Sequence, residues 1–289
     1  MNNDIANKIE RIRKLTRIKV DTFKVNNTGG ESLIIDINNK WIFRFPRTNL
    51  MLKKSIESFK FQESFAKVSP VKVPIIKYLA EDFIGYKKLA GRHISPSTIE
   101  RLSVKDKIKI AKELGSFLKA LHSFKSNKIT KDTGYLVMRK KDYQTCPKEI
   151  VKHLNSKETN HLKLQFKAIA NNKMNFTANK KIIHGDFHFN NILWNFEKKK
   201  LTGVIDWSEA GYGVPAMDFI MLADFSKPKN DIFLKNMLLA YGEKDGNLFN
   251  QIKENYIIDV MNWYWTYLQE DKPKSQARTI KKLKRILGS

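Results

Sequence analysis

Two short segments, HGDFHFNN at 184–191 and VIDW at 204–207, constrain this chain more than any other feature of its sequence. Asp186 and Asn191 lie near the two ends of the first segment, and Asp206 follows a β-branched run in the second. We expect both segments to contain loops at the ends of short strands, where a rigid sheet can direct side chains into one cleft. The spacing therefore predicts a fold that brings these three side chains together.

These residue types suit the transfer of a phosphoryl group from a nucleoside triphosphate. Asp186 can accept a hydrogen bond from an acceptor hydroxyl and align it for attack, and His184 can brace the loop through its ring nitrogens. Catalysis of such a reaction is mostly positioning and neutralisation of charge. We predict Asp186 and His184 as the catalytic residues. Asn191 and Asp206 offer the oxygen atoms that Mg²⁺ prefers, so we predict them as the metal ligands.

The same segments have two other interpretations. Asn and Asp are favoured in polar turns, so two ordinary hairpins would also carry them, but the joint spacing of HxDx₄N and IDW is too specific for that. A zinc site made by His184, Asp186 and His188 is the second alternative, because alternate residues of a strand share a face. It lacks a further His or Cys at ligand spacing. We expect His188 to lie near the phosphates or to be exposed.

Composition limits the class of protein. A chain of 289 residues with 42% hydrophobic residues can build one large or two modest domains. Its apolar runs are shorter than the ~18–20 residues of a membrane span, and residues 1–15 read as an amphipathic helix rather than a signal peptide. The single Cys146 excludes an intramolecular disulfide and permits a reducing compartment. We expect a monomeric cytoplasmic enzyme.

The net charge of +25 raises nucleic acid as a partner. The lysines are, however, spread along the whole chain, and the densest runs lie at 198–200 and 281–285. No recognition helix, zinc spacing or aromatic RNA-binding strand accompanies these runs. We interpret the charge as a solvated basic surface and do not expect nucleic acid to bind.

Hydrophobic periodicity divides the chain into two parts. In the first part we expect a small antiparallel sheet, with helices at 3–16 and 52–66 and strands at 19–25, 32–37, 41–45, 71–76 and 83–89. The second part reads as mainly helical, with helices at 103–124, 147–175 and from 218 onward, and short strands at 182–183, 192–194 and 201–205. We predict an α+β fold with an N-terminal lobe at 1–86, a hinge at 87–91 and a helical lobe at 92–289.

Several segments resemble the aminoglycoside phosphotransferase family of kinase-like small-molecule phosphotransferases. The most specific are HGDFHFNNILW (184–194) and GVIDWSEAGYGVPAMDF (203–219), and AKELGSFLKALHS (111–123) resembles the helix that this family carries after its hinge. NNKWIFRFPR (38–47) and FIGYKKLAGRHIS (83–95) look like a strand and the hinge of the 2''-aminoglycoside phosphotransferase branch. The resemblance covers most of the chain from about residue 21 to residue 225. It implies a bilobal protein-kinase-like fold, with an antiparallel-sheet lobe and a mostly helical lobe.

The roles that the resemblance implies agree with the chemistry above. Asp186 takes the place of the catalytic aspartate, and Asn191 and Asp206 take the places of the metal ligands. The nucleotide would contact a flexible loop and the strand after it, through Thr28, Gly29, Gly30, Ser32 and Arg44. Arg44 falls where many relatives have a lysine that contacts the α/β-phosphates. An arginine is always charged and can bind two phosphate oxygens.

The resemblance also implies contacts for Arg44 and for the purine. Glu57 on the following helix is the expected ion-pair partner of Arg44, with Glu63 as the alternative. The hinge would offer backbone groups to the purine of ATP or GTP, which makes Tyr86 and Lys88 nucleotide-binding candidates. The sequence does not distinguish the two nucleotides.

Two features follow the second segment. Asp218, in the Pro-x-x-Asp pattern at 215–218, is expected to brace the catalytic loop. Trp207 and Ser208 stand where eukaryotic protein kinases have Phe-Gly, so their activation-loop switching is not implied.

The acceptor is the least constrained part of the interpretation. An aminoglycoside is a polycation, and its pocket would need carboxylates. Candidate acceptor-binding residues are acids near the second segment and in the late helices, with one aromatic neighbour: Glu209, Asp224, Asp259, Trp263 and Glu270. The alternatives are surface acids paired with lysines, and aromatic residues packed in the core. We favour an aminoglycoside; a macrolide, choline or another metabolite, or an inactive nucleotide-binding module, are the competing hypotheses.

Overall fold

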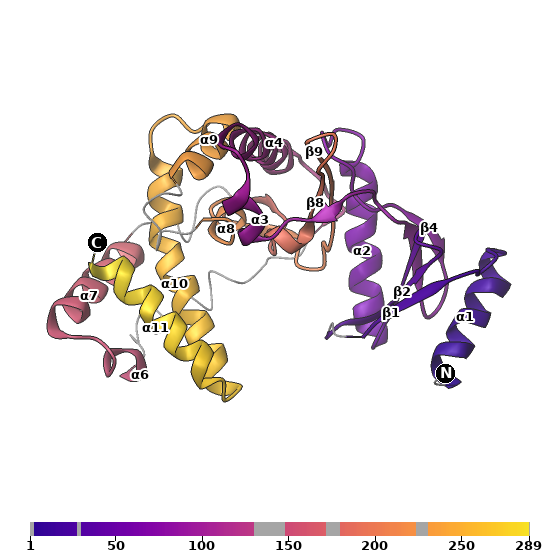
Figure 1. Cartoon of the computed structure of the whole chain (residues 1–289), viewed down its shortest axis with the longest axis horizontal. Helices are drawn as coiled ribbons and strands as arrows, with labels where there is room; N and C mark the ends of the chain where they lie inside the picture. Colours follow the sequence, from indigo (N-terminus) through magenta and orange to yellow (C-terminus); the bar gives the residue numbers. More distant parts are fainter. Residues whose placement is uncertain (1–2, 28–29, 130–147, 172–179, 224–230, 289) are drawn as a thin grey trace.

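The computed structural model describes residues 3–27, 30–129, 148–171, 180–223 and 231–288, and these form two lobes (Figure 1). The smaller lobe holds a sheet with two helices, and the larger lobe gathers the remaining helices around α10 (Asn247–Gln269). Thr28, Gly29 and Asp224 lie outside the described residues. None of the described helices combines the length and the apolar character that a membrane span requires.

The smaller lobe is built on an antiparallel sheet with the strand order β1-β2-β3-β5-β4. Its strands are β1 (Phe23–Asn26), β2 (Ser32–Ile37), β3 (Trp41–Pro46), β4 (Ile76–Leu79) and β5 (Ile84–Lys87). The helix α1 (Asn3–Thr16) buries Ile9 and Ile12 against one face of this sheet. The opposite face carries Ile34, Arg44 and Ile84, which pair across three neighbouring strands. Arg44 thereby points toward the larger lobe.

The strand expected at 71–76 is wrong for most of its length, because β4 begins only at Ile76. Pro74 supplies no backbone N–H to a ladder. Val71 and Val73 are buried in the core of the larger lobe instead of in a sheet. The apolar alternation of these residues correctly predicts that they are buried. It wrongly predicts that they pair with a strand of the sheet.

The helix α2 (Asn49–Phe65) connects the two lobes. Thr48 caps it, and its hydroxyl oxygen accepts a backbone N–H of the first turn at 3.2 Å. Phe59 packs beneath the sheet. Phe61 and Phe65, by contrast, are fully buried in the core of the larger lobe. The helix therefore lies within the sequence of the smaller lobe, but its side chains pack in the cores of both lobes.

The larger lobe combines two small antiparallel sheets with helices. Its strands are β6 (Arg92–His93), β7 (Lys181–Ile183), β8 (Ile192–Asn195), β9 (Lys200–Val204) and β10 (Gly211–Gly213), paired as β6-β8-β9 and β10-β7. Its described helices, besides α10, are α3 (Pro96–Arg101), α4 (Val104–Ser123), α6 (Lys148–Val151), α7 (Ser156–Asn171), α8 (Met217–Ile220), α9 (Asp231–Tyr241) and α11 (Pro273–Gly288). The helices α4 and α9 pack along each other, as do α10 and α11. The two predicted loops follow β7 and β9.

The helix expected at 147–175 is interrupted between α6 and α7. Asn155 Oδ1 accepts the N–H of Glu158 at 2.8 Å, and a carboxylate oxygen of Glu158 accepts the N–H of Asn155 at 2.9 Å. This reciprocal capping begins a new helix. Residues 172–175 lie outside the described part of the chain.

Candidate active site

The loop from His184 to Asn191 joins β7 to β8 and is held from behind by Asp218. The Asp218 side chain is fully buried and accepts the backbone N–H groups of His184 (2.8 Å) and Gly185 (2.9 Å). His122 of α4 donates a third hydrogen bond to it through Nε2 at 3.0 Å. Asp218 therefore braces this catalytic loop, as the sequence predicts.

His184 ties the catalytic loop to the end of β9. Its Nε2 donates to the carbonyl oxygen of Ile205 at 3.0 Å, and its Nδ1 accepts the N–H of Asp186 at 3.4 Å. Burial lowers the pKa of His184, which favours a neutral ring with one donor and one acceptor. His184 thus braces the loop through both ring nitrogens.

The backbone at Gly185 leaves no room for a side chain. Its φ is +82°, and a Cβ there would lie 2.3 Å from the carbonyl oxygen of Glu209. A larger residue would be strained in its own backbone and would push the neighbouring segment away. The catalytic loop and the segment after Asp206 can therefore lie in direct contact.

Asp186 is partly exposed, and two neighbours hold one of its carboxylate oxygens. Asn191 is buried and donates through Nδ2 to the carbonyl oxygen of Asp186 (2.9 Å) and to its Oδ2 (3.0 Å). His188 donates to the same Oδ2 at 3.3 Å, and this hydrogen bond raises the pKa of His188. His188 therefore lies against Asp186 itself. Among the described residues, no group binds Asp186 Oδ1.

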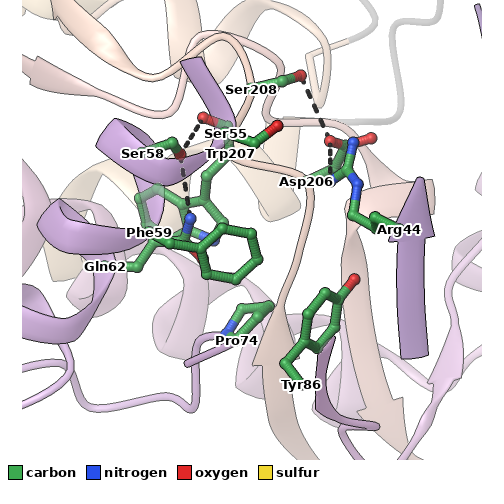
Figure 2. Close-up of a pocket in the computed structure, with 10 residues that line it drawn as sticks. All are labelled: Arg44, Ser55, Ser58, Phe59, Gln62, Pro74, Tyr86, Asp206, Trp207 and Ser208. Atoms are coloured by element: carbon green, nitrogen blue, oxygen red, sulfur yellow. Dashed lines mark hydrogen bonds and ion pairs between the residues drawn. The ribbon is translucent and has the colours of Figure 1, made fainter. Parts of the chain in front are cut away.

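Asp206 begins the second loop with a φ of +60°, a conformation that Asp tolerates better than most residues. Its Oδ1 accepts hydrogen bonds from Arg44 Nη1 (3.2 Å) and Ser208 Oγ (3.4 Å), as Figure 2 shows. The N–H of Ile205 donates to the carbonyl oxygen of Asn191 at 2.9 Å. The two loops are therefore joined directly, and the residues predicted from both segments come together.

Arg44 pairs with the second loop rather than with Glu57, so the expected ion pair is not formed. The Arg44 side chain is largely buried, whereas Glu57 and its alternative Glu63 lie exposed on α2. Helical phase explains the difference, because residues four apart share a face of a helix. That phase turns Ser58 and Gln62 into the small pocket that Arg44 also lines (Figure 2).

Two side-chain oxygen atoms of the site are not used in these hydrogen bonds and suit a hard divalent cation. Asn191 Oδ1 and Asp206 Oδ2 have no hydrogen-bond partner within the described ranges. Mg²⁺ commonly takes one or two protein oxygens, with phosphates and water completing its shell. By contrast, no three His, Cys, Asp or Glu residues of the described chain form a metal-binding group. The described residues therefore do not group as the alternative zinc site would require.

Among the predicted nucleotide contacts, Tyr86 lies beside Arg44, and burial raises its pKa. Ser32 is buried at the start of β2, directly after Gly30 and Glu31. Thr28 and Gly29, the other two expected loop contacts, lie outside the described residues. The described part of this loop therefore leads into the strand next to Arg44.

The side chain and the backbone N–H of Lys88 make contacts within the smaller lobe. Its Nζ binds Asp36 Oδ2 at 2.5 Å and Asn39 Oδ1 at 2.7 Å, and its backbone N–H donates to the carbonyl oxygen of Lys40 at 2.8 Å. Both donors are used within the smaller lobe. Lys88 fastens the hinge to the hairpin between β2 and β3 through these contacts, and its contact with the purine remains a prediction.

The fold and the two loops agree with the comparison to known proteins. The model of the phosphotransferase enzyme family (APH) matches residues 20–251. The chain belongs to this family.

Solved structures similar to this phosphotransferase-family chain share its fold over nearly the whole length. The GDP complex of wild-type aminoglycoside 2'-phosphotransferase-IIIa is 17% identical with a TM-score of 0.81, and 99% of each chain is covered. The gentamicin complex of APH(2'')-IIa is 20% identical with a TM-score of 0.69, over 96% of this chain and 95% of that chain. The macrolide 2'-phosphotransferase MphH from Brachybacterium faecium is 16% identical with a TM-score of 0.69, over 97% of this chain and 98% of that chain. The fold is the bilobal kinase-like fold.

The described acids that were predicted to bind an acceptor lie in a loop, within α10 and at the end of α10. Glu209 is exposed beside the catalytic loop, and Asp259 is half-buried on α10. Glu270 pairs with Lys272 at 2.7 Å, which is the surface ion pair that the alternative interpretation expects. Trp263 is 41% exposed and stacks on Tyr267 with ring centroids 5.6 Å apart. Asp224 lies outside the described residues, so the structure leaves the acceptor-binding set as a prediction.

Four residues of this family member were missed by sequence reasoning. Ser58 and Gln62 line the same small pocket as Arg44, and their spacing of four positions is the signal that could have found them. His122 accepts a hydrogen bond through Nδ1 from the Tyr241 hydroxyl at 3.1 Å, while its Nε2 binds Asp218. Burial raises the pKa of Tyr241 to about 12. No feature of the sequence near Tyr241 indicates this contact.

Proposed function

We propose that this protein transfers the γ-phosphoryl group of ATP or GTP to a hydroxyl of a small molecule, with an aminoglycoside as the favoured acceptor. One observation carries the proposal: Asp186 is partly exposed and hydrogen-bonded to Asn191, beside a loop whose Asp206 pairs with Arg44. Membership of the phosphotransferase enzyme family supports the reaction class. The lobe boundaries that we propose remain 1–86, 87–91 and 92–289.

Asp186 is suited to orient the acceptor. Its Oδ2 is held by Asn191 and His188, which leaves Oδ1 to accept a hydrogen bond from the incoming hydroxyl. Fixing that hydroxyl in line with the phosphoryl group removes most of its orientational freedom before reaction. An orienting or proton-accepting group of this kind typically contributes ~10²–10⁴-fold to the rate.

The Arg44–Asp206 side of the site is suited to the triphosphate. Arg44 uses one N–H on Asp206, so further guanidinium N–H groups can bind phosphate oxygens. Asn191 Oδ1 and Asp206 Oδ2 are the oxygens that would hold Mg²⁺. When bound, the ion neutralises charge on the phosphate oxygens. The chain's own residues supply fixed positive charge and fixed orientation.

Three considerations support an aminoglycoside as acceptor. Similar folds are described in complex with kanamycin, with gentamicin, and with streptomycin and ATP. Glu209 lies beside the catalytic loop, where a carboxylate would bind a protonated amine. The exposed Trp263–Tyr267 stack offers aromatic faces to a cation. A macrolide is the competing acceptor, since a macrolide 2'-phosphotransferase shares the fold.

A transfer screen tests the proposal. Purified protein is incubated with ATP or GTP, with and without Mg²⁺, and with aminoglycosides, macrolides or choline, and phosphorylated product is detected by mass spectrometry. We expect Mg²⁺-dependent phosphorylation of at least one aminoglycoside. Turnover of a macrolide or choline alone would contradict the aminoglycoside as acceptor, while the proposed phosphoryl transfer would stand. Nucleotide binding without transfer to any alcohol would favour an inactive module.

A further inference from the structure

His122 lies in the last turn of α4, and its side chain is only 1% exposed. Both of its ring nitrogens have a partner. Nε2 lies 3.0 Å from Asp218 Oδ2, and Nδ1 lies 3.1 Å from the hydroxyl oxygen of Tyr241. One imidazole ring therefore lies between the buried carboxylate that holds the catalytic loop and the last residue of α9.

The two partners of His122 determine where its hydrogen lies. Asp218 accepts two backbone N–H groups through its carboxylate and offers only acceptor oxygens to the ring. Nε2 therefore carries the hydrogen, and in a neutral ring Nδ1 is then an acceptor. The Tyr241 hydroxyl supplies the matching donor. Burial raises the pKa of Tyr241 to about 12, so the hydroxyl keeps its hydrogen at neutral pH.

The packing of α9 against α4 holds Tyr241 in this place. Its ring lies at 70° to that of His122 and at 87° to that of Phe219, with ring centroids 5.4 Å and 5.2 Å apart. The two helices approach closely at Gly115, where a Cβ would lie 2.1 Å from the carbonyl oxygen of Met237. The hydroxyl of Tyr241 is therefore directed at His122 by contacts along both helices.

We propose that Tyr241 is a positioning residue for the catalytic loop, because it holds His122 in the tautomer that donates to Asp218. The proposal deepens the proposed function and rests on it for the role of Asp186. Hydrogen bonds run from Tyr241 through His122 to Asp218, which binds the first two backbone N–H groups of the catalytic loop. The next residue of that loop is Asp186. The helix α9 thereby helps to place the carboxylate that orients the acceptor.

Nuclear magnetic resonance of isotope-labelled wild-type protein tests the tautomer directly. We expect a neutral His122 ring with its hydrogen on Nε2 and a hydrogen-bonded Nδ1. In Tyr241→Phe, the Nδ1 resonance should move toward that of a free imidazole nitrogen, and the Nε2 hydrogen should exchange faster with solvent. A wild-type ring with hydrogen on Nδ1, or on both nitrogens, would overturn the proposal. The wild-type measurement needs no variant and no acceptor.

Hydrogen exchange of backbone amides separates positioning from a general loss of stability. In Tyr241→Phe, the N–H groups of His184 and Gly185 should exchange up to about tenfold faster, as for loss of one buried hydrogen bond. Tyr264→Phe is the matched control, because it removes a tyrosine hydroxyl that lies 3.2 Å from Nε2 of another histidine, His153. It should leave these two N–H groups as in the wild type. Equal acceleration in both variants would overturn the proposal.

Turnover assays measure the effect on catalysis. Tyr241→Phe should lower kcat roughly 3–10-fold, with the nucleotide Kd unchanged, since Arg44 and Asp206 lie outside this chain of hydrogen bonds. His122→Phe keeps a ring and removes both nitrogens, so adding Tyr241→Phe to it should lower kcat no further.

Two kinetic results would overturn the inference: a wild-type kcat in Tyr241→Phe, or an equal loss of kcat with and without the His122 ring nitrogens. If no acceptor is phosphorylated at all, the proposed function fails. The tautomer of His122 and the exchange of the two loop N–H groups then still decide this proposal.

Discussion

The catalytic loop and the loop around Asp206 are both held from behind, but by different parts of the molecule. Behind the catalytic loop lies Asp218, which receives two backbone N–H groups and His122, all from the larger lobe. Behind the Asp206 loop lie Arg44 of β3 and Ser58 of α2, from the smaller lobe. The proposed acceptor side is thus built by one lobe, whereas the proposed phosphate side needs both.

The second loop can depend on the smaller lobe because α2 is fixed in place. Phe61 and Phe65 lie against Trp207 with ring centroids 5.9 Å and 5.8 Å apart, and Phe65 also contacts Phe117 and Phe124. Fully buried aromatic side chains contribute large hydrophobic stabilisation. This aromatic cluster opposes a swing of α2 away from the loop around Asp206. Changes behind the catalytic loop should therefore affect stability and kcat, and changes behind the second loop should affect nucleotide binding.

The largest effect should come from Asp186→Asn. The amide keeps the size of the side chain but orients the acceptor hydroxyl poorly, so kcat should fall ~10²–10⁴-fold. Nucleotide affinity should stay near that of the wild type, since Asp186 faces the acceptor. Turnover assays and nucleotide titrations on the same preparation measure both. A variant that loses nucleotide binding and retains kcat would contradict the assignment of the catalytic loop to the acceptor and of the second loop to the nucleotide.

The next largest effect should come from Asp218→Ala. The substitution leaves two backbone N–H groups and His122 without their buried acceptor, and each buried donor left unpaired typically costs about 1–3 kcal/mol. Urea unfolding should show this loss, together with a lower kcat. Unchanged stability would mean that the catalytic loop is held by other contacts.

Ser58→Ala should have a smaller effect on stability. It removes the hydrogen bond to the buried carbonyl of Trp207, and an unpaired buried acceptor costs about 1–3 kcal/mol. Chemical unfolding measures this cost. Ser58→Ala should change KM for the nucleotide more than it changes kcat. Asp218→Ala, by contrast, should lower kcat. The reverse pattern would contradict the assignment of the second loop to the phosphate side.

The smallest effect should be a pH dependence from His184. Its pKa is lowered by burial, so the unfolded chain binds a proton more readily than the folded one. The stability that neutral His184 contributes is present above its ordinary pKa of about 6.5 and is lost as pH falls below it, by at most about 1.4 kcal/mol per pH unit. The stability difference between the wild type and His184→Gln should shrink from pH 7.5 to pH 5. A difference that grows on acidification would contradict the sign.

The catalytic loop could be predicted from sequence because its function depends on local spacing. Asp186, Asn191 and the bracing Asp218 are fixed by short segments whose residue types have few other uses. The helix α1 was also predicted at its observed bounds, since its apolar positions repeat with helical period. These features need no knowledge of distant contacts.

The phosphate side could not be predicted as well, because it depends on helical phase and on contacts between lobes. Glu57 has the right charge and lies on the wrong face of α2, while the uncharged Ser58 and Gln62 face the site. Lys88 lies in the predicted hinge, yet its side chain binds Asp36 and Asn39 of a hairpin distant in sequence. The charge of a residue alone does not predict which residue its side chain binds in the folded protein.

A crystal structure with Mg²⁺ and a non-hydrolysable nucleoside triphosphate tests the central claim most directly. The account predicts one ion bound by Asn191 Oδ1 and Asp206 and shared with the nucleotide phosphates, with Arg44 on those phosphates and Asp186 facing the acceptor side. A nucleotide bound away from these residues, or an ion held by other ligands, would contradict it.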